Sequence, residues 1–416
     1  MSANPPYGYD YTSLAPPTFA DPFVNAATGQ SVLQPFPEPI LHSGASPSHP
    51  GSAVPWNQFL PITGVPSFYR GNVPPYAETY SLTIQREIVR DTVLSVGYIG
   101  SESHHQLVLM SANPGNPVEC LALNAMGATP TCGPFGEANT YTLPDGQTVQ
   151  GTRGPFSSQF DAVTYQKTIG NANYNALQVN LRHQSGPLEF LVAYSYSKSI
   201  DESSSLAEPV NPINPGLSRA ISAFDLRHNF VASYKYNLPI PVLLRQKNRW
   251  TKGWAISGIT RLSSGLPVTL FNNTDSSLLG SIPNGINNNG VDTPYVAPGD
   301  LEINMNPRNG GTAFNTGLFC VPGASGCPAA LGGMGNVPRR FFYGPALEDV
   351  DIALHKVVSI TESKSLEFRA EVFNVFNHAQ FFAPATVNGN ISSSNFGWIL
   401  SADAPREVQL AAKFSF

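Results

Sequence analysis

Apolar and polar residues alternate along several segments of this chain. In residues 77–88 the apolar side chains share one face and the polar ones share the other, with Tyr80, Leu82 and Ile84 opposite Ser81, Thr83 and Gln85. Successive side chains of a β-strand point to opposite faces of its sheet, so this period of two predicts a strand with one apolar face. A turn at Arg90-Asp91 leads into a second alternating segment, and together the two predict a hairpin.

The same alternation recurs to the end of the chain. The segments are 77–88, 92–100, 173–184, 188–200, 227–239, 253–271, 349–360, 364–377 and 406–416. They predict about ten strands, several of them about 10 residues long, the length that crosses a bilayer when the strand is tilted. Lys356 interrupts the apolar face of 349–360, whereas Glu367, Arg369 and Glu371 all lie on the polar face of 364–377.

Long and short connections separate the predicted strands. Residues 101–172 and 272–345 read as two long loops, whereas turns such as Ser185-Gly186-Pro187 are tight. Loops above about 15 residues are uncommon in compact soluble domains. Short turns at one end and long loops at the other are typical of transmembrane barrels, although a soluble antiparallel sheet also alternates. With fewer strands than a large barrel, we expect two unpaired edges, at 77–88 and 406–416.

Composition favours the membrane interpretation. Charged residues make up 12% of the chain, against about 25% in soluble domains. The 36 glycines and 38 prolines disfavour long helices. No run of 18 apolar residues occurs, which excludes a transmembrane helix. The net charge is −5 and basic residues form no run that would follow a phosphate backbone, so nucleic acid is not an expected partner.

Four cysteines form two local pairs in segments rich in Gly, Pro and Asn. We predict disulfides between Cys120 and Cys132 and between Cys320 and Cys327, both in extracellular loops. The alternatives are four unrelated thiols or a zinc site, and the latter is disfavoured because neither pair has CxxC spacing or a neighbouring histidine.

No arrangement of residues indicates catalysis. His104 and His105 are adjacent and would point to opposite faces of a strand, which disfavours a shared metal. The carboxylates of Asp201-Glu202 and of Glu348-Asp349-Asp351 are either solvated loop charges or a cation site at a barrel mouth. We therefore predict no enzyme activity, no catalytic or metal site and no cofactor.

Several segments, taken in order, resemble one family. They are LQPFPEPI (33–40), ETYSLTIQREIVRDTVLSVGYIGSESHH, NYNALQVNLRHQ, AYSYSKSIDESSS, FDLRHNFVASYKYNLP, GWAISGITRLSSGLPVTL, PRRFFYGPALEDVDIALHKVVSITESKSLEFRAEVFNVFNHAQF and PREVQLAAKFSF. This set is similar to the C-terminal barrel portion of Oar-like TonB-dependent transporters, outer-membrane receptors abundant in Acidobacteria. The resemblance covers roughly residues 30–416 and implies a 22-stranded barrel with an N-terminal plug.

The chain departs from that family pattern at its N-terminal side. It shows no signal peptide, no plug and no TonB-contact motif, so we expect a truncated or split product that reaches the TonB system only through a missing N-terminal part. The expected fold is an all-β, antiparallel, partial transmembrane barrel of about 8–12 strands with long extracellular loops. Residues 1–75 would be a Pro-rich loop remnant, and 76–416 the C-terminal half of the barrel.

Three functions follow from this picture. The first is an outer-membrane component of a receptor that takes up an unidentified substrate. The second is a non-transporting surface or adhesion protein, and the third is a secreted carbohydrate-binding β-protein. The sequence does not distinguish a siderophore, a glycan, a peptide or cobalamin as the ligand.

Two groups of residues fit an outer-membrane barrel in particular. Rings near strand ends are predicted to form an interfacial aromatic girdle in contact with outer-membrane lipid: Tyr194, Tyr196, Tyr234, Tyr236, Trp250 and Trp254. The final strand ends on an aromatic residue and alternates back to Val408. Its apolar face is predicted to be a signal for the barrel-assembly machinery, which would bind it by strand addition: Val408, Leu410, Phe414 and Phe416.

Overall fold

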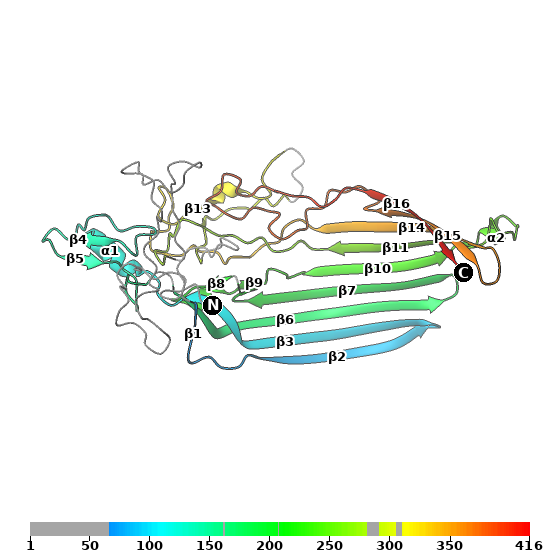
Figure 1. The fold of residues 1–416 in the computed structure, drawn as a ribbon, viewed down its shortest axis with the longest axis horizontal. Helices are drawn as coiled ribbons and strands as arrows, with labels where there is room; N and C mark the ends of the chain where they lie inside the picture. The colour runs from blue at the N-terminus through cyan, green and yellow to red at the C-terminus, as the bar shows by residue number, and fades with distance from the viewer. Residues whose placement is uncertain (1–65, 161–162, 207, 281–290, 305–309) are drawn as a thin grey trace, which may run out of the picture.

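The structure is a computed structural model that describes residues 66–160, 163–206, 208–280, 291–304 and 310–416. The predicted Pro-rich segment 1–75, with LQPFPEPI in it, lies outside the described residues up to residue 65. Nine long strands form one antiparallel sheet in the order β16-β15-β14-β11-β10-β7-β6-β3-β2 (Figure 1). Their bounds are β2 Tyr76–Val89, β3 Thr92–Ser111, β6 Thr164–Ser185, β7 Leu188–Asp201, β10 His228–Asn237, β11 Trp254–Ser263, β14 Leu347–Ser359, β15 Ser365–Phe373 and β16 Glu407–Ser415.

Short elements surround these strands. Three short strands pair with the loop-end portions of β6, β3 and β7, respectively, which brings the described sheet to twelve strands: β1 Pro66–Phe68, β8 Pro209–Val210 and β9 Ala220–Ile221. The remaining elements are α1 Pro117–Ala125, β4 Thr140–Thr142, β5 Thr148–Gln150, the 3-10 helix η3 Pro215–Ser218, α2 Ile240–Leu243, β12 Tyr295–Val296, the 3-10 helix η4 Thr316–Leu318 and β13 Phe319–Cys320. In the described part of the chain, no helix is long and apolar enough to span a membrane.

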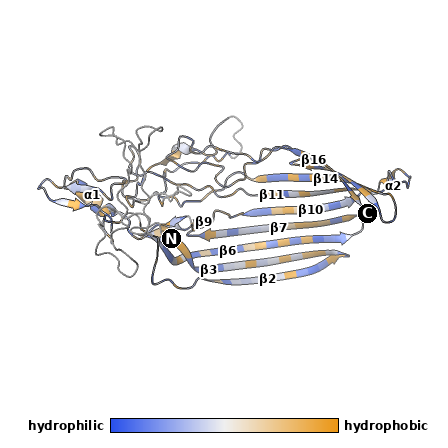
Figure 2. Cartoon of the chain, viewed as in Figure 1, coloured by the Kyte–Doolittle hydropathy of each residue, from blue (hydrophilic) through white to orange (hydrophobic). Residues whose placement is uncertain are grey.

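The register of the strands places the alternating residues in continuous rows. Val96 pairs with Val179, which pairs with Tyr194 on the next strand. One residue away, on the opposite face, polar Ser95 pairs with Asn180. Figure 2 shows the resulting change of hydropathy along each strand. The sheet therefore has one apolar face and one polar face, as a membrane barrel wall requires.

The two ends of the sheet differ in their connections. At one end, the connections are residues 112–163, 202–227, 264–346 and 374–406. At the other end, they are 90–91, 186–187, 238–253 and 360–364. We call these the loop end and the turn end (Figure 1). Both outermost strands, β2 and β16, run from the loop end to the turn end.

Within the described residues, the sheet is open. β2 pairs only with β3, and β16 pairs only with β15, so each leaves one edge unpaired among the described strands. Both strands are exposed along their whole length. These are the two edges that the sequence predicted.

Three sequence expectations need correction. The loop predicted over 101–172 is shorter, because β3 continues to Ser111 and β6 begins at Thr164. The strand predicted over 253–271 ends at Ser263, and the residues after it leave the sheet. A short helix, α1, also lies inside a segment that was predicted to be loop; Asn116 caps its N-terminus by accepting a hydrogen bond from the Glu119 amide.

The described parts of the loop-end connections fold together into what we call the loop cap. Its larger apolar core draws on the connections 264–346 and 374–406 and consists of Val268, Leu270, Ala313, Phe314, Phe319, Val337, Phe342 and Val387. A smaller core lies around α1 and consists of Cys120, Leu123, Ala128, Cys132, Tyr141 and Leu278. Leu270 belongs to the segment that was expected to be strand, and it is fully buried here. The cap is thus a packed structure and not a set of solvated loops.

Candidate functional site

Two adjacent arginines connect the loop cap to the end of β7. Arg339 donates from Nη2 to Oδ1 of Asp201 over 2.7 Å and from Nη1 to the carbonyl of Glu202 over 2.6 Å. Asp201 is the last residue of β7 and is buried. A guanidinium presents several donors in a fixed plane, so one arginine can hold both a carboxylate and a carbonyl. This contact fixes a loop more than a hundred positions away in the sequence to a strand end.

Arg340 is the second arginine, and it is buried more deeply. Its guanidinium forms an ion pair with Glu208, and its Nε donates to Thr269 Oγ1 over 2.8 Å. Burial lowers the pKa of Arg340 to about 10, although the charge of Asp201 opposes that effect. Glu208 also accepts a hydrogen bond from the Ser204 amide over 2.8 Å. A buried charge pair with its remaining hydrogen bonds satisfied is costly to break, because the partner left behind stays desolvated.

A tyrosine–carboxylate pair continues this network. The Tyr343 hydroxyl donates to Oδ2 of Asp225 over 2.7 Å, and Oδ1 of Asp225 accepts from the Ser199 amide over 2.5 Å. Burial, followed by the hydrogen bond to Asp225, raises the pKa of Tyr343 to about 12. Burial also raises the pKa of Asp225. Arg227 lies over the Tyr343 ring, 4.6 Å from its centre.

A second buried polar cluster lies near α1. Arg153 Nη2 and Glu137 Oε2 are 3.5 Å apart, and both side chains are buried. Asp275 accepts hydrogen bonds from the amides of Phe135 and Gly280, each over 2.9 Å. Desolvation, and then the hydrogen bond and negative charge of Glu137, raise the pKa of Asp275 to about 8. Asp275 and Glu137 therefore hold a proton between them at neutral pH, because ionising both of two neighbouring buried carboxylates is energetically unfavourable.

Of the carboxylates singled out in the sequence, Asp201 and Glu202 are not solvated loop charges, whereas Glu348, Asp349 and Asp351 lie in β14 and Glu348 is exposed. Asp201 pairs with Arg339, and Glu202 Oε1 lies 3.8 Å from Arg219 Nη1. Among the residues that the structure describes, no group of three or more His, Cys, Asp or Glu side chains is arranged to hold a metal ion. His104 and His105 lie in β3, beside a shift of register, and the Tyr76 ring lies 5.1 Å and 5.7 Å from them.

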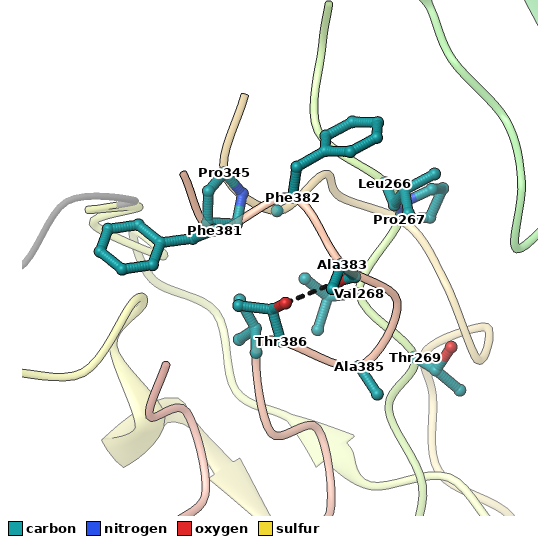
Figure 3. A pocket seen from close by; sticks show the side chains of 12 residues that line it. Leu266, Pro267, Val268, Thr269, Pro345, Phe381, Phe382, Ala383, Ala385 and Thr386 are labelled. Carbon is teal, nitrogen blue, oxygen red and sulfur yellow. Dashed lines mark hydrogen bonds between the residues drawn. The ribbon is translucent and has the colours of Figure 1, made fainter. Parts of the chain in front are cut away.

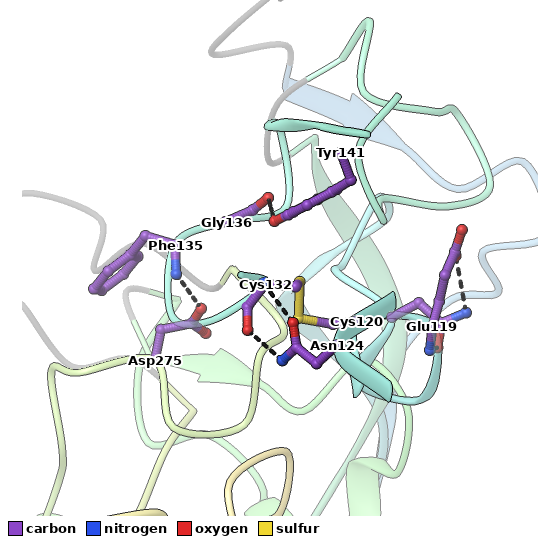
Figure 4. The surroundings of a disulfide bond; sticks show 9 residues. Glu119, Cys120, Asn124, Cys132, Phe135, Gly136, Tyr141 and Asp275 are labelled. Atoms are coloured by element: carbon purple, nitrogen blue, oxygen red, sulfur yellow. Dashed lines mark hydrogen bonds between the residues drawn. A yellow bond between two sulfur atoms is a disulfide. The ribbon is translucent and has the colours of Figure 1, made fainter. Parts of the chain in front are cut away.

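The structure brings together both predicted cysteine pairs. Cys120 of α1 is bonded to Cys132, and Cys320 of β13 is bonded to Cys327; the Cα atoms are 5.4 Å and 5.7 Å apart. Both bonds lie in the loop cap. Figure 4 shows the first, beside which the Asn124 side chain donates to the Cys132 carbonyl and accepts from its amide. The disulfide therefore closes a loop that hydrogen bonds also hold.

Two hollows in the loop-end region differ in size. One lies between residues 266–269 of one connection and residues 381–387 of another, and Figure 3 shows the Thr386 hydroxyl bonded to the Ala383 carbonyl at its wall. Its volume of about 20 Å³ has room for roughly one water molecule. The other is an aromatic depression of about 430 Å³ that could hold a small ligand. It is lined by Phe68, Tyr69, Arg70, Phe156, Phe160, Val163 and Tyr165.

The polar face of the sheet carries a short ladder of charges. Arg369 donates from Nε to Glu367 Oε1 over 2.9 Å, and its Nη1 lies 3.6 Å from Glu371 Oε1. His355 Nδ1 lies 3.4 Å from the same Glu367 oxygen. These groups alternate with apolar residues on β14 and β15, and they would be costly in contact with hydrocarbon. The polar face is therefore the inner face of a barrel wall, and the apolar face is the outer one.

A family model described as "Outer membrane beta barrel domain" matches residues 1–409. The chain belongs to this family. The predicted antiparallel barrel class and outer-membrane location are thereby confirmed. The sequence matches none of the curated proteins.

Among solved structures, this outer membrane barrel chain is similar to several proteins, including two receptors and a transporter. The ferric-catecholate import receptor Fiu from Escherichia coli K12 has 10% identity and a TM-score of 0.37, over 85% of this chain and 30% of that one. The transporter YddB from Escherichia coli has 9% identity and a TM-score of 0.40, over 85% of this chain and 34% of that one. The pyoverdine receptor FpvA from Pseudomonas aeruginosa PAO1 has 11% identity and a TM-score of 0.38, over 83% of this chain and 30% of that one. The chain spans about a third of the length of these three proteins.

The outer face of the barrel wall carries aromatic side chains at two levels. At the loop end, Tyr196 lies 5.1 Å from the His228 ring. At the turn end, Trp254 accepts a backbone hydrogen bond from Leu238. Ten residues of β10 and its end separate these two levels. This separation is roughly 33 Å along a strand, which is about 25 Å along the barrel axis when the strand is tilted by about 40°. That spacing matches the height of an apolar band, and the girdle remains a prediction. Tyr194, Tyr234 and Tyr236 lie on the same face between the two levels.

The C-terminal strand presents its alternating residues on the edge of the barrel wall. Leu410 pairs with Ala370 and Phe414 pairs with Leu366, both in the apolar rows. Val408 and Leu410 are exposed, and Phe416 at the turn end is 92% exposed. An exposed strand edge is what strand addition needs, so the assembly signal stays a prediction with a suitable geometry.

Two features of this barrel were missed in the sequence. The Arg339-Arg340 pair had no periodic signal, and its buried partners are distant in the chain. Neither Tyr80 nor Tyr98 was assigned to the girdle, although their rings lie 6.2 Å apart at the loop-end level. Both hydroxyls point to Asn175, over 3.5 Å and 2.6 Å. A polar partner such as Asn175 is expected for tyrosine rings that lie at an interface, with the ring in an apolar environment and the hydroxyl in a polar one.

Proposed function

We propose that this chain is the distal part of the barrel of a TonB-dependent receptor of the Oar-like type, and that it takes part in substrate uptake. Residues 76–416 would supply the barrel wall and the loop cap, with 1–75 as an extracellular loop remnant. The TonB system would act through a plug and contact motif located elsewhere. Membership of the outer membrane barrel family supports the first half of this proposal.

The observation that carries the uptake role is the packed loop cap at one end of the wall. Its buried ion pairs and two apolar cores hold long loops in one arrangement. Barrels have their longer loops on the extracellular side, so this cap would face the medium. A preorganised surface loses little entropy on binding, which suits capture of a scarce substrate. The inner charge ladder of His355, Glu367 and Arg369 would then line the path below it.

A genomic replacement tests the proposal in the native host. Arg339 and Arg340 are both changed to Gln, and growth is measured with a ferric siderophore, a glycan, a peptide or cobalamin as the limiting nutrient. Uptake predicts loss of growth on one nutrient, and that loss should be matched by removing the energy-transducing protein. The matched control is Arg219→Gln, a half-exposed cation at the same end.

The alternative is a surface protein that binds without transport, with the loop cap as its adhesive surface. The aromatic depression around Tyr69 and Tyr165 favours this function, because it is a preformed hollow of about 430 Å³ where β1 and β6 meet the connection 112–163. Lys167 lies over the Tyr69 ring, 4.8 Å from its centre. Under this alternative, the Arg339 and Arg340 changes would leave growth unaltered on every nutrient, and Tyr165→Ala would reduce attachment of cells to a surface.

A further inference from the structure

One connection at the turn end is unlike the others. The described turn-end connections at 90–91, 186–187 and 360–364 are tight, whereas residues 238–253 form a longer excursion that contains α2. Four of the 23 lysines and arginines of the chain lie in it, and it has no acidic residue. The four are Arg245, Lys247, Arg249 and Lys252. We call residues 238–253 the basic connection.

The basic connection also exposes large apolar side chains. Val242, Leu243 and Leu244 follow one another along α2 and its end, and Trp250 is 72% exposed. Figure 1 shows α2 beyond the ends of the neighbouring strands. Exposed apolar groups this close together indicate a surface that contacts something other than water. The basic residues beside them indicate that this contact carries negative charge.

The backbone of the basic connection is held in place by Lys356. This lysine interrupts the apolar face of β14, and its side chain reaches the connection. Its Nζ donates to the carbonyls of Arg249 and Trp250 over 2.9 Å and of Lys252 over 2.5 Å. The Trp254 indole also donates to the Trp250 carbonyl, over 2.8 Å. The arrangement is therefore built into the fold, and it explains why a cation lies in an apolar row.

The exposed tryptophan joins the basic connection to the outer face of the wall. Trp250 and Trp254 line an apolar groove of about 570 Å³ whose other walls include Leu354, Phe368 and Leu410. Those three residues belong to the apolar rows of β14, β15 and β16. The apolar surface of the wall thus continues into the connection, with Lys356 beneath the Trp254 ring in the same groove.

From this combination we infer that the basic connection docks on the anionic phospholipid headgroups of the leaflet at the turn end. The four cations would lie among the phosphates, and the apolar side chains with Trp250 would enter the boundary below them. Basic residues beside exposed apolar and aromatic ones are the composition that binds an anionic membrane surface. An acidic protein would satisfy the charges, but it would not explain why the patch is continuous with the lipid-facing surface.

Lipid-selective quenching of Trp250 tests this inference. The full chain, with Trp56, Trp254 and Trp398 changed to Phe, is refolded into mixed vesicles of phosphatidylglycerol and phosphatidylcholine. The bilayer composition is kept constant, and only one of the two lipids carries bromine in each sample. Each cation near an anionic surface is worth roughly a fivefold preference. We expect quenching by brominated phosphatidylglycerol to exceed quenching by brominated phosphatidylcholine several-fold, and the excess to fall toward one as salt is added.

Two sets of substitutions distinguish an effect of the four clustered cations of the basic connection from an effect of total positive charge. Changing Arg245, Lys247, Arg249 and Lys252 to Gln should bring the quenching ratio close to one. The matched control changes four dispersed cations near the same end to Gln: Arg86, Arg90, Lys364 and Lys413. It removes the same charge and should leave the ratio unchanged.

Three results would overturn the inference. They are equal quenching by both lipids at low salt, an equal loss of the ratio in the control, or no quenching by either lipid. The last is what docking on a protein would give. The salt titration of the parent chain decides the matter on its own if the quadruple variant fails to insert.

Discussion

The Arg340–Glu208 pair predicts how firmly the loop cap is held on the barrel wall. Arg340→Met removes the buried guanidinium and leaves Glu208 with Arg339 as its nearest cation, 3.6 Å away. Removing one partner of a buried ion pair costs about 3–5 kcal/mol. Because Arg339 still partly compensates the charge of Glu208, we expect a cost at the low end of this range, about 3 kcal/mol. The free energy of opening the cap should fall by that amount, which is roughly a hundredfold in its opening equilibrium.

Hydrogen exchange read by mass spectrometry measures this opening in the detergent-refolded chain. Peptides from 200–225 and 330–345 should exchange about a hundredfold faster in Arg340→Met, while peptides from the wall strands keep their protection. Arg219→Met is the control, because that side chain is 44% exposed and its pair should contribute less than about 1 kcal/mol. Adding Glu208→Gln to Arg340→Met should restore most of the protection. If Arg340→Met behaved like the control, the pair would not hold the cap.

Four further predictions concern other parts of the molecule. Since the pKa of Asp275 is raised to about 8 by its surroundings, its protonated form stabilises the cap; cap stability in thermal melts should fall as the pH rises from about 4 to 8, and Asp275→Asn should flatten that fall. Non-reducing mass spectrometry should find Cys120 bridged to Cys132 and Cys320 to Cys327, and reduction should cost about 2–3 kcal/mol for each closed loop. Deleting Phe416 should lower insertion of any complete barrel that contains this strand, measured by fractionation and heat-modifiability, without changing expression. Brominated lipid should quench Trp254 in reconstituted protein, and an unquenched Trp254 would not belong to the girdle.

Much of the barrel wall could be predicted from the sequence because an apolar face against lipid imposes a period of two. The rows through Val96, Val179 and Tyr194 follow from that alternation alone. The ends of the strands were less predictable. β3 continues through the polar residues 101–106, where apolar alternation stops. Beyond the hydrocarbon both faces of a strand can be polar, so periodicity ends before the strand does.

The loop cap was largely unpredictable for a different reason. The contacts of Arg339 and Arg340 join residues more than a hundred positions apart, and no local pattern marks such pairs. Leu270 read as part of a strand because β-branched and apolar residues surround it, yet it is buried in the cap core. Lys356 looked like a defect in an apolar row, and its explanation lies in carbonyls on another connection. In each case the conformation depends on contacts with residues that are far away in the sequence.

The shared direction of β2 and β16 has a consequence for how a cylinder could be completed. If these two edges met, within one chain or between copies related by a rotation about the barrel axis, they would form a parallel pair. An antiparallel cylinder therefore needs an odd number of further strands between them. Hairpins add strands two at a time and preserve parity, so growth by hairpin duplication alone would never close this wall. Any complementing segment has to enter at the turn end and leave at the loop end.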